Sequence, residues 1–118
     1  MLDESSVTLS HEALLRALGL CAKARALVYG VPMICEALKG GKKPLLVLHA
    51  SDNAPNSDKR LRDRCAYYGV RLVRIGTDGE TLAKALGKTS RLAAVAVTDE
   101  HLCRLVLSKL EKDCASVN

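Results

Sequence analysis

Hydrophobic residues recur along this chain at two spacings that alternate from one end to the other. Over residues 11–24 they fall at helical spacing, as at Leu14 and Leu18, behind Ser10, a residue type that caps helices. Residues 44–50 instead form an unbroken apolar run of strand length, PLLVLHA, which is typical of a strand covered on both faces. The chain therefore opens with a helical pattern and carries a buried strand near its middle.

The same two patterns continue through the rest of the chain. Helical spacing recurs over 31–40, 58–68 and 81–86, and again in a last helix whose apolar positions are Leu102, Leu105, Val106 and Leu110. Short apolar runs of strand length occupy 26–30, 70–75 and 91–98. The residues expected to start these helices are Pro32, then Asn56 or Ser57, then Thr77 paired with Glu80, and finally Thr98 or Asp99.

Helix and strand thus alternate from residue 10 onward. This alternation predicts an α/β fold in which helices cover both faces of a sheet, a three-layer α/β/α sandwich. No repeat, low-complexity tract or change of composition divides the chain. We expect one domain over residues 10–113, preceded by a flexible polar leader (1–9) and followed by a tail (114–118).

Composition narrows the choice of core and of partner. The chain has three Tyr and no Phe or Trp, so the core must be aliphatic, and we expect no RNA-binding platform of exposed aromatic residues on a sheet. The net charge is +5, with 18 basic and 13 acidic residues. Charge alone leaves two interpretations open, attraction to phosphate and ordinary solubility.

The five cysteines are widely spaced and include no C-x-x-C pair. Cys21, Cys65 and Cys103 each fall on a predicted apolar helix face, where a free Cys behaves as a small hydrophobe. This spacing favours free thiols over a disulfide framework or a metal site, and it indicates a reducing, cytoplasmic location. The acidic first residues and the lack of a long apolar run predict neither a signal peptide nor a membrane span.

The sequence contains none of the motifs that mark the common catalytic sites: no nucleophile elbow, P-loop, dinucleotide fingerprint or zinc-protease helix. His49 ends an apolar strand, while Asp99 and Glu100 are explained by the favourable N-terminal dipole of the last helix. No nucleophile or metal partner accompanies them. We therefore expect a non-catalytic protein without a cofactor.

Basic residues gather at three places. Lys39, Lys42 and Lys43 surround the turn after the second helix; a second group lies on the third helix, and a third surrounds the loop of residues 87–91. The second group consists of Lys59, Arg60, Arg62 and Arg64, beside Asp58 and Asp63. A solvated helix face explains it. The loop reads GKTSR and combines a glycine, two hydroxyls and two cations, which suits a phosphate backbone; an ordinary connecting loop is the alternative.

Four segments, taken in order, resemble one known family. They read LGLCAKARALVYG, LLVLHASDNA, RCAYYGV and LAKALGKTSRLAAVAVTD, and they extend from about residue 14 to residue 105. Their most specific part is the Leu-Gly-Lys-x-x-Arg run at residues 86–91. In this order they are similar to the YlxQ-like branch of the L7Ae/L30e/S12e/Gadd-type ribosomal-protein family, which binds RNA, often at kink-turns. The resemblance implies an α/β/α fold with a four-stranded mixed sheet, and RNA, ribosomal or kink-turn-like, as the partner.

The resemblance also implies two RNA-contacting segments. One is the turn and helix start after Gly30, and the other is the loop from Gly87 to Arg91. The first segment departs from the family pattern at Ala26, Val31, Pro32, Met33 and Glu36, which replace a basic residue, a polar stretch and a Lys. Glu in place of Lys would repel a phosphate. The expected RNA-contacting residues are Gly30, Lys39, Lys42, Lys43, Gly87, Lys88, Thr89, Ser90 and Arg91.

Two functions of different kinds follow. The first is a non-catalytic, ribosome- or ribonucleoprotein-associated RNA-binding protein that contacts structured RNA through residues 87–91 and nearby basic residues. The alternative is a protein-interaction module on the same fold, which would use the apolar residues Val31, Pro32, Met33 and Ile34 as its partner surface. An RNA-modifying enzyme comes third, because it would need a pocket with convergent polar groups.

Overall fold

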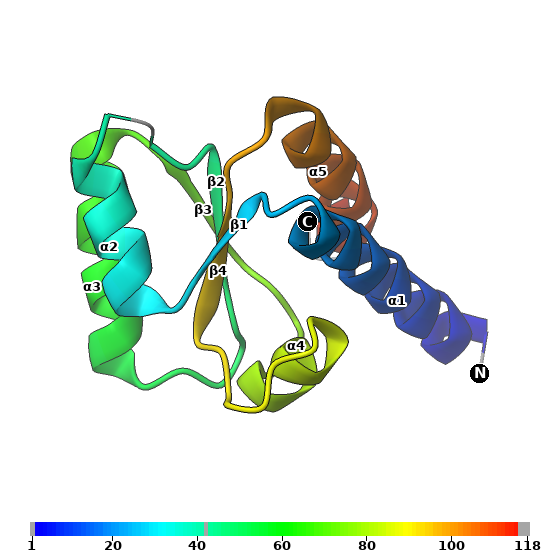
Figure 1. Cartoon of the computed structure of the whole chain (residues 1–118). Helices are drawn as coiled ribbons and strands as arrows, with labels where there is room; N and C mark the ends of the chain where they lie inside the picture. Colours follow the sequence, from blue (N-terminus) through cyan, green and yellow to red (C-terminus); the bar gives the residue numbers. More distant parts are fainter. Residues whose placement is uncertain (1, 42, 116–118) are drawn as a thin grey trace.

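The computed structural model describes residues 2–41 and 43–115, and side chains within 12–41 and 43–110. Five helices enclose a four-stranded sheet (Figure 1). The elements are α1 (Leu2–Lys23), β1 (Leu27–Tyr29), α2 (Val31–Lys39), β2 (Leu46–His49), α3 (Pro55–Tyr68), β3 (Arg71–Arg74), α4 (Gly79–Ala85), β4 (Ala94–Val97) and α5 (Glu100–Ala115). The predicted α/β class and the helix–strand alternation are confirmed.

The sheet is mixed, with strand order β1-β4-β2-β3. Strand β4 runs antiparallel to both of its neighbours, whereas β2 and β3 are parallel and joined by α3. Pairing places His49, Arg74 and Ala94 in one row at one end of the sheet, and Gly30 joins them by donating its N–H to the Ala94 carbonyl. We call this the Gly30 end. It is the lower end in Figure 1, where α4 lies.

The opposite end of the sheet is defined by Leu27, Leu46, Arg71 and Val97, which pair in a second row. We call it the Lys43 end, because Lys43 lies in the turn that leads into β2. Helix α2 runs from the Gly30 end to the Lys43 end alongside α3 (Figure 1). The two ends therefore carry different loops.

Two aliphatic cores cover the two faces of the sheet. Leu46, Leu48 and Val95 pack with residues of α1, α4 and α5, whereas Val47 and Ala96 pack with residues of α2 and α3. Successive side chains of a strand point to opposite faces, so each apolar strand supplies both cores. Both central strands, β2 and β4, are buried throughout, as the unbroken apolar run predicted.

Two predicted helix starts, those of the first and third helices, differ from the structure. Helix α1 begins at Leu2 instead of after Ser10, and thus includes residues expected to form the leader; no Gly or Pro in residues 2–18 stops a helix there. Helix α3 begins at Pro55 behind Ala54, so neither predicted cap is used; a Pro in the first turn has no N–H to satisfy. The leader's flexibility, and the tail over 114–118, stay predictions.

The fourth helix is capped one residue later than predicted, while the fifth agrees. In α4 the Asp78 side chain accepts a hydrogen bond from the Thr81 N–H at 2.7 Å, so the predicted box of Thr77 and Glu80 is wrong. Thr77 is buried. Asp99 was one of two predicted caps for α5, and its Oδ1 accepts the Leu102 N–H at 2.9 Å.

The cysteines behave as apolar core residues. Cys21, Cys35, Cys65 and Cys103 are buried free thiols, as the helical spacing of three of them predicted. Burial raises the pKa of Cys65 to about 11, so that thiol stays protonated at neutral pH. The side chain of Cys114 lies outside the described residues. No helix within the described part of the chain is both long and apolar enough to span a bilayer.

Candidate functional site

Gly30 joins the start of α2 to the segment that enters β4. Its N–H donates to the Ala94 carbonyl at 2.9 Å, and its own carbonyl accepts the Ile34 N–H that opens the helix. Its backbone has φ 85° and ψ 150°, a region that glycine alone adopts without strain. The predicted contact point Gly30 therefore lies next to the strand that follows the 87–91 loop.

Lys88 is a cation of the predicted loop that contacts the residue directly before Gly30. Its Nζ lies 4.1 Å from the centroid of the Tyr29 ring, a cation–π contact, and Tyr29 directly precedes Gly30. Its backbone N–H donates to the Ala83 carbonyl at 2.8 Å, which ends α4. Contacts of this kind are worth about 0.5–1 kcal/mol at exposed sites. They position the ammonium group at the Gly30 end while leaving it open to solvent.

The rest of the loop contributes hydroxyls more than backbone groups. Thr89 and Ser90 are exposed. The Gly87 N–H donates to the Lys84 carbonyl at 3.2 Å, so it is already used at the end of α4. The backbone N–H of Gly87 is therefore not available to a phosphate. The hydroxyls of Thr89 and Ser90 are the groups this loop offers alongside Lys88.

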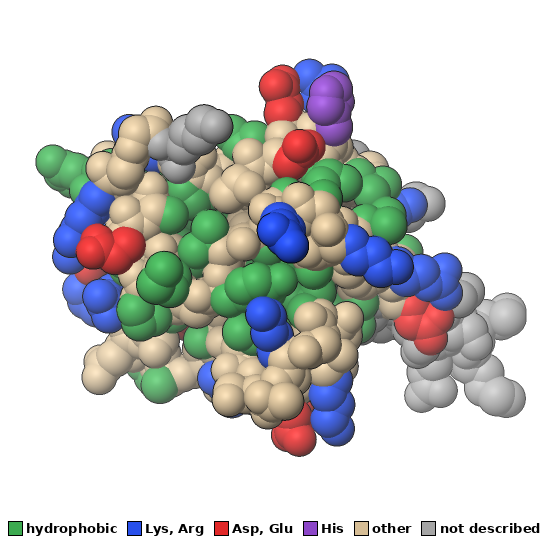
Figure 2. Space-filling model, in the orientation of Figure 1, with side chains coloured by type: hydrophobic (Ala, Val, Ile, Leu, Met, Phe, Trp, Pro, Cys, Tyr) green, Lys and Arg blue, Asp and Glu red, His purple; other side chains and the backbone are tan. Residues whose placement is uncertain are grey.

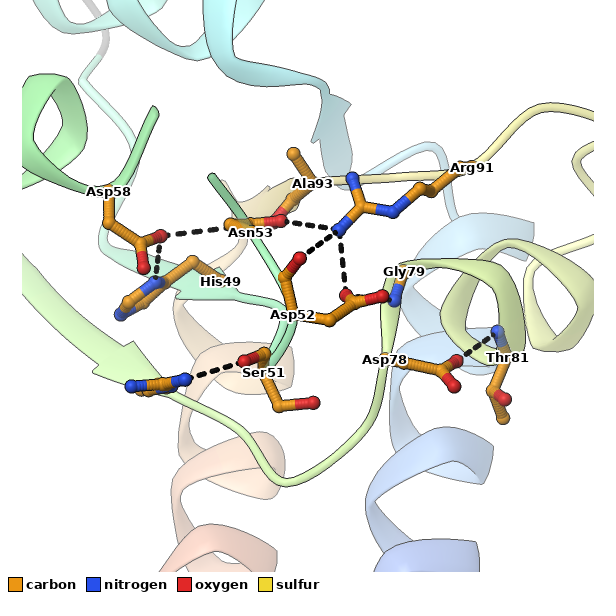
Figure 3. A network of polar contacts seen from close by, with 11 residues as sticks. His49, Ser51, Asp52, Asn53, Asp58, Asp78, Gly79, Thr81, Arg91 and Ala93 are labelled. Atoms are coloured by element: carbon orange, nitrogen blue, oxygen red, sulfur yellow. Dashed lines mark hydrogen bonds and ion pairs between the residues drawn. The ribbon is translucent and has the colours of Figure 1, made fainter. Parts of the chain in front are cut away.

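Hydrogen bonds hold the Arg91 side chain against the β2–α3 loop (Figure 3). Its Nη2 donates to Asp52 Oδ1 at 2.7 Å, to the Asp52 carbonyl at 3.0 Å and to Asn53 Oδ1 at 3.0 Å. Asp52 Oδ1 also accepts the Gly79 N–H at 3.0 Å. The hydrogen bonds from Gly79 and Arg91 hold the pKa of Asp52 below its usual value. Arg91 thus holds the β2–α3 loop against α4, and its contact with RNA stays a prediction.

A second polar cluster adjoins this one and was not expected to be functional. His49 Nδ1 lies 2.8 Å from Asp58 Oδ1, and the Asn53 side-chain amide donates to the same oxygen at 3.1 Å and to the Ala93 carbonyl at 2.8 Å. Burial favours a raised pKa for Asp58, but the hydrogen bonds from His49 and Asn53 outweigh it and lower that pKa. Asn53 is the link between the two clusters, because it also accepts from Arg91.

The other predicted basic residues lie at the Lys43 end. Lys43 Nζ is 5.4 Å from the Tyr68 ring centroid, and Lys39 Nζ is 4.0 Å from a Glu36 carboxylate oxygen. Lys42 lies outside the described residues. Nine residues of α2 separate the two ends, about 13 Å of helix. The structure therefore divides the predicted contacts between two places.

The apolar segment at the start of α2 is divided between the core and the surface. Val31 and Ile34 are buried in the α2–α3 core, while Pro32 and Met33 are exposed, Met33 with 60% of its surface. Two of the four residues proposed as a partner surface are thus core residues. On the face shown in Figure 2, Lys and Arg side chains are spread around central hydrophobic surface instead of forming one basic patch.

The described side chains offer no ready metal centre, since within 12–41 and 43–110 no three of His, Cys, Asp and Glu converge. At the Gly30 end, His49 is paired with Asp58 and Arg91 with Asp52, while other polar groups there are exposed. Cations, hydroxyls and amides in such an arrangement can hold phosphate oxygens.

Comparison with known proteins shows which proteins this chain is similar to. The chain is 30% identical over 94 residues to the RNA-binding protein YlxQ of Bacillus subtilis (strain 168). The aligned stretch covers 80% of this chain and 91% of that protein. A protein of unknown function from Bacillus halodurans C is 30% identical in sequence, with a TM-score of 0.75 over 83% of this chain and 96% of that one.

A 15.5kD RNA binding protein from Giardia lamblia has the same fold. Its TM-score is 0.72 at 22% identity, covering 92% of this chain and 88% of that one. Residues 12–106 match the family model of the ribosomal proteins that the resemblance named. The chain therefore belongs to the Ribosomal protein L7Ae/L30e/S12e/Gadd45 family.

Proposed function

We propose that this protein binds structured RNA without catalysing a reaction, and that the Gly30 end of the sheet is its main contact surface. The family and the name of the Bacillus subtilis relative support RNA as the partner. The contact residues are Gly30, Gly87, Lys88, Thr89 and Ser90. The four buried free thiols among the described side chains fit a reducing, cytoplasmic setting, in which ribosomal or ribonucleoprotein RNA is present.

One observation carries the choice of surface: the Lys88 ammonium is held over the ring of Tyr29, the residue that directly precedes Gly30. A cation positioned in advance loses less conformational freedom when it meets a phosphate than a free lysine does. Gly30 has no side chain, so backbone of a partner can approach closely where α2 begins. Two segments 57 positions apart in the sequence thus meet at one surface, and they are the two segments that the family resemblance implies.

The chemistry proposed for this surface is mainly contact with phosphate and sugar. Lys88 supplies the charge, and the hydroxyls of Thr89 and Ser90 supply hydrogen bonds. The first turn of α2 presents Pro32 and Met33 to solvent, which lack the polar groups needed to read the edges of unpaired bases. We therefore propose that the protein recognises the shape of a kinked RNA more than its base sequence. Lys39 and Lys43 would add a second contact for an RNA long enough to follow α2.

The test compares Lys88→Glu with Lys23→Glu, an equal charge reversal at an exposed residue in the last turn of α1. Affinity for a kink-turn hairpin is measured at several salt concentrations. Loss of one phosphate contact lowers the salt slope by about 0.7–0.9. We expect that decrease and weaker binding in Lys88→Glu, and a near wild-type slope in Lys23→Glu. Equal behaviour of the two variants would refute the assignment of the surface.

A further inference from the structure

A cleft of about 490 Å³ opens at the Gly30 end on the α3 side of the sheet. Its lining residues are His49, Asn53, Pro55, Asp58, Arg62 and Arg74. His49 and Arg74 are paired neighbours at the carboxyl ends of the parallel strands β2 and β3. Ligands of open α/β sheets bind outside the carboxyl ends of such strands. The cleft therefore occupies a favourable position for a ligand.

His49 forms the floor of this cleft and has one ring nitrogen engaged. Its side chain is only 9% exposed, and its Nδ1 lies 2.8 Å from the Asp58 carboxylate. A carboxylate accepts hydrogen bonds, so we assign the proton to Nδ1. Nε2 makes no hydrogen bond to the residues that the structure describes, and none of their buried side-chain nitrogens or oxygens lacks a partner. Nε2 therefore reaches solvent through the cleft.

The walls of the cleft carry two guanidinium groups. The Nη2 of Arg74 donates to the Ser51 carbonyl, which fixes that side chain across the end of β3. Among the side chains described, neither Arg62 nor Arg74 lies within ion-pair distance of a carboxylate. With one carboxylate, Asp58, against two guanidiniums, the lining is net positive. A planar guanidinium donates in a fork that matches two oxygens of a phosphate.

We infer that this cleft binds a phosphate group through the guanidinium groups of Arg62 and Arg74, with the His49 ring lying beside it. The phosphate belongs to RNA or to a free nucleotide; the RNA source rests on the function proposed above. Asn53 lines the cleft and also accepts a hydrogen bond from Arg91 at 3.0 Å, so the cleft adjoins the 87–91 loop. An RNA strand on that loop would bring a further phosphate to the cleft.

The first experiment needs no RNA. Inorganic phosphate and adenosine monophosphate are titrated to millimolar concentration against the ¹⁵N-histidine-labelled protein, and the His49 ring is followed by NMR. We expect its Nε2 resonance to shift in the wild type, and the shift to be lost in Arg62→Gln/Arg74→Gln. The matched control is Arg60→Gln/Arg64→Gln, which removes the same charge from elsewhere on α3 and should keep the shift.

The second experiment measures RNA affinity against salt for the same variants. Loss of the one phosphate contact that the cleft makes lowers the salt slope by about 0.7–0.9, whereas the control changes it less. That decrease assigns the phosphate to RNA; a His49 shift without the decrease supports the cleft with a free nucleotide as ligand. If neither probe shifts His49 and the slope equals the control's, the inference is overturned, even where Lys88-dependent RNA binding is intact.

Folding of each variant is checked by thermal unfolding before either titration. Arg74 holds the Ser51 carbonyl, so the double variant can lose stability for that reason. The single variant Arg62→Gln keeps this bond and is exposed on α3. In Arg62→Gln we expect a reduced His49 shift and a slope decrease no larger than that of the double variant. A wild-type response in that folded variant also counts against the cleft.

Discussion

Gly79, at the start of α4, packs against the β2–α3 loop and Arg91, and a single added methyl tests that packing. Gly79 is the first residue of α4 and is buried. Its N–H donates to Asp52 Oδ1 at 3.0 Å, and its carbonyl accepts the Leu92 N–H at 3.0 Å. Both backbone groups are therefore fixed by neighbours that belong to other segments.

An alanine at this position has no room. Its Cβ would lie 2.7 Å from the Leu92 carbonyl oxygen, 2.7 Å from Arg91 Cγ and 2.9 Å from Arg91 Cζ. Arg91 can swing away only by leaving Asp52 and Asn53, and the Leu92 oxygen belongs to the backbone. Overpacking of this kind costs about 1–3 kcal/mol. We expect Gly79→Ala to lower the free energy of unfolding by that amount.

Gly19→Ala is the matched control. An added Cβ at Gly19 meets nothing within 4 Å, and the residue lies inside helix α1. There alanine is more stable than glycine by about 0.5–1 kcal/mol, so this variant should gain stability. Equilibrium urea unfolding of both variants measures the difference. A Gly79→Ala protein as stable as wild type would refute the close packing described here.

Three further changes test other parts of the account by the same unfolding measurement. Gly30→Ala places a side chain at φ 85° and ψ 150°, and we expect a loss of about 1–3 kcal/mol; no loss would mean that the turn differs. Leu48→Ala empties a fully buried site between sheet and helices and should cost about 2–5 kcal/mol; a smaller loss would argue against that core. Asp58→Asn tests the part-buried pair that Asp58 forms with His49. Because folding lowers the pKa of Asp58, its contribution to stability is complete above the unfolded value of about 3.9 and is lost as pH falls through the folded pKa. The stability gap between wild type and Asp58→Asn should therefore narrow below about pH 4, and a constant gap from pH 7 to pH 3 would contradict this.

The fold was accessible from the sequence because local patterns and tertiary structure agree. The apolar run over 44–50 is a buried central strand, and Cys21, Cys65 and Cys103 are buried on the helix faces that their spacing predicted. Helix starts were less accessible. Asp78 and Thr77 are neighbouring residues that both suit a cap, and only the path of the backbone decides between them.

The arrangement of the site depends on contacts that local patterns do not contain. Arg91 and Asp52 are 39 positions apart, and nothing in either segment indicates that Arg91 is bound there. His49 and Asp58 lie nine positions apart on a strand and a helix, outside any periodic pattern. The division of the basic residues between two ends of the sheet follows from strand direction: Lys43 precedes β2 and Lys88 precedes β4, and these two strands are antiparallel.

The alternation of buried and exposed residues at the start of α2 also depends on tertiary contacts. The segment is uniformly apolar, so hydrophobicity gave no means of separating core from surface. Val31 and Ile34 are three positions apart and face the α2–α3 core, whereas Pro32 and Met33 lie on the outer side. Knowing where α3 packs settles which residues are available to a partner.

The most direct measurement of the central claim is an NMR map of the RNA-contacting surface. A kink-turn hairpin is titrated into ¹⁵N-labelled protein, and backbone amide shifts are recorded along the chain. We expect the largest changes at Gly30 and over residues 87–91, with smaller ones at Lys39 and Lys43. Changes confined to α1 and α5, or no changes at all, would contradict RNA binding at the Gly30 end.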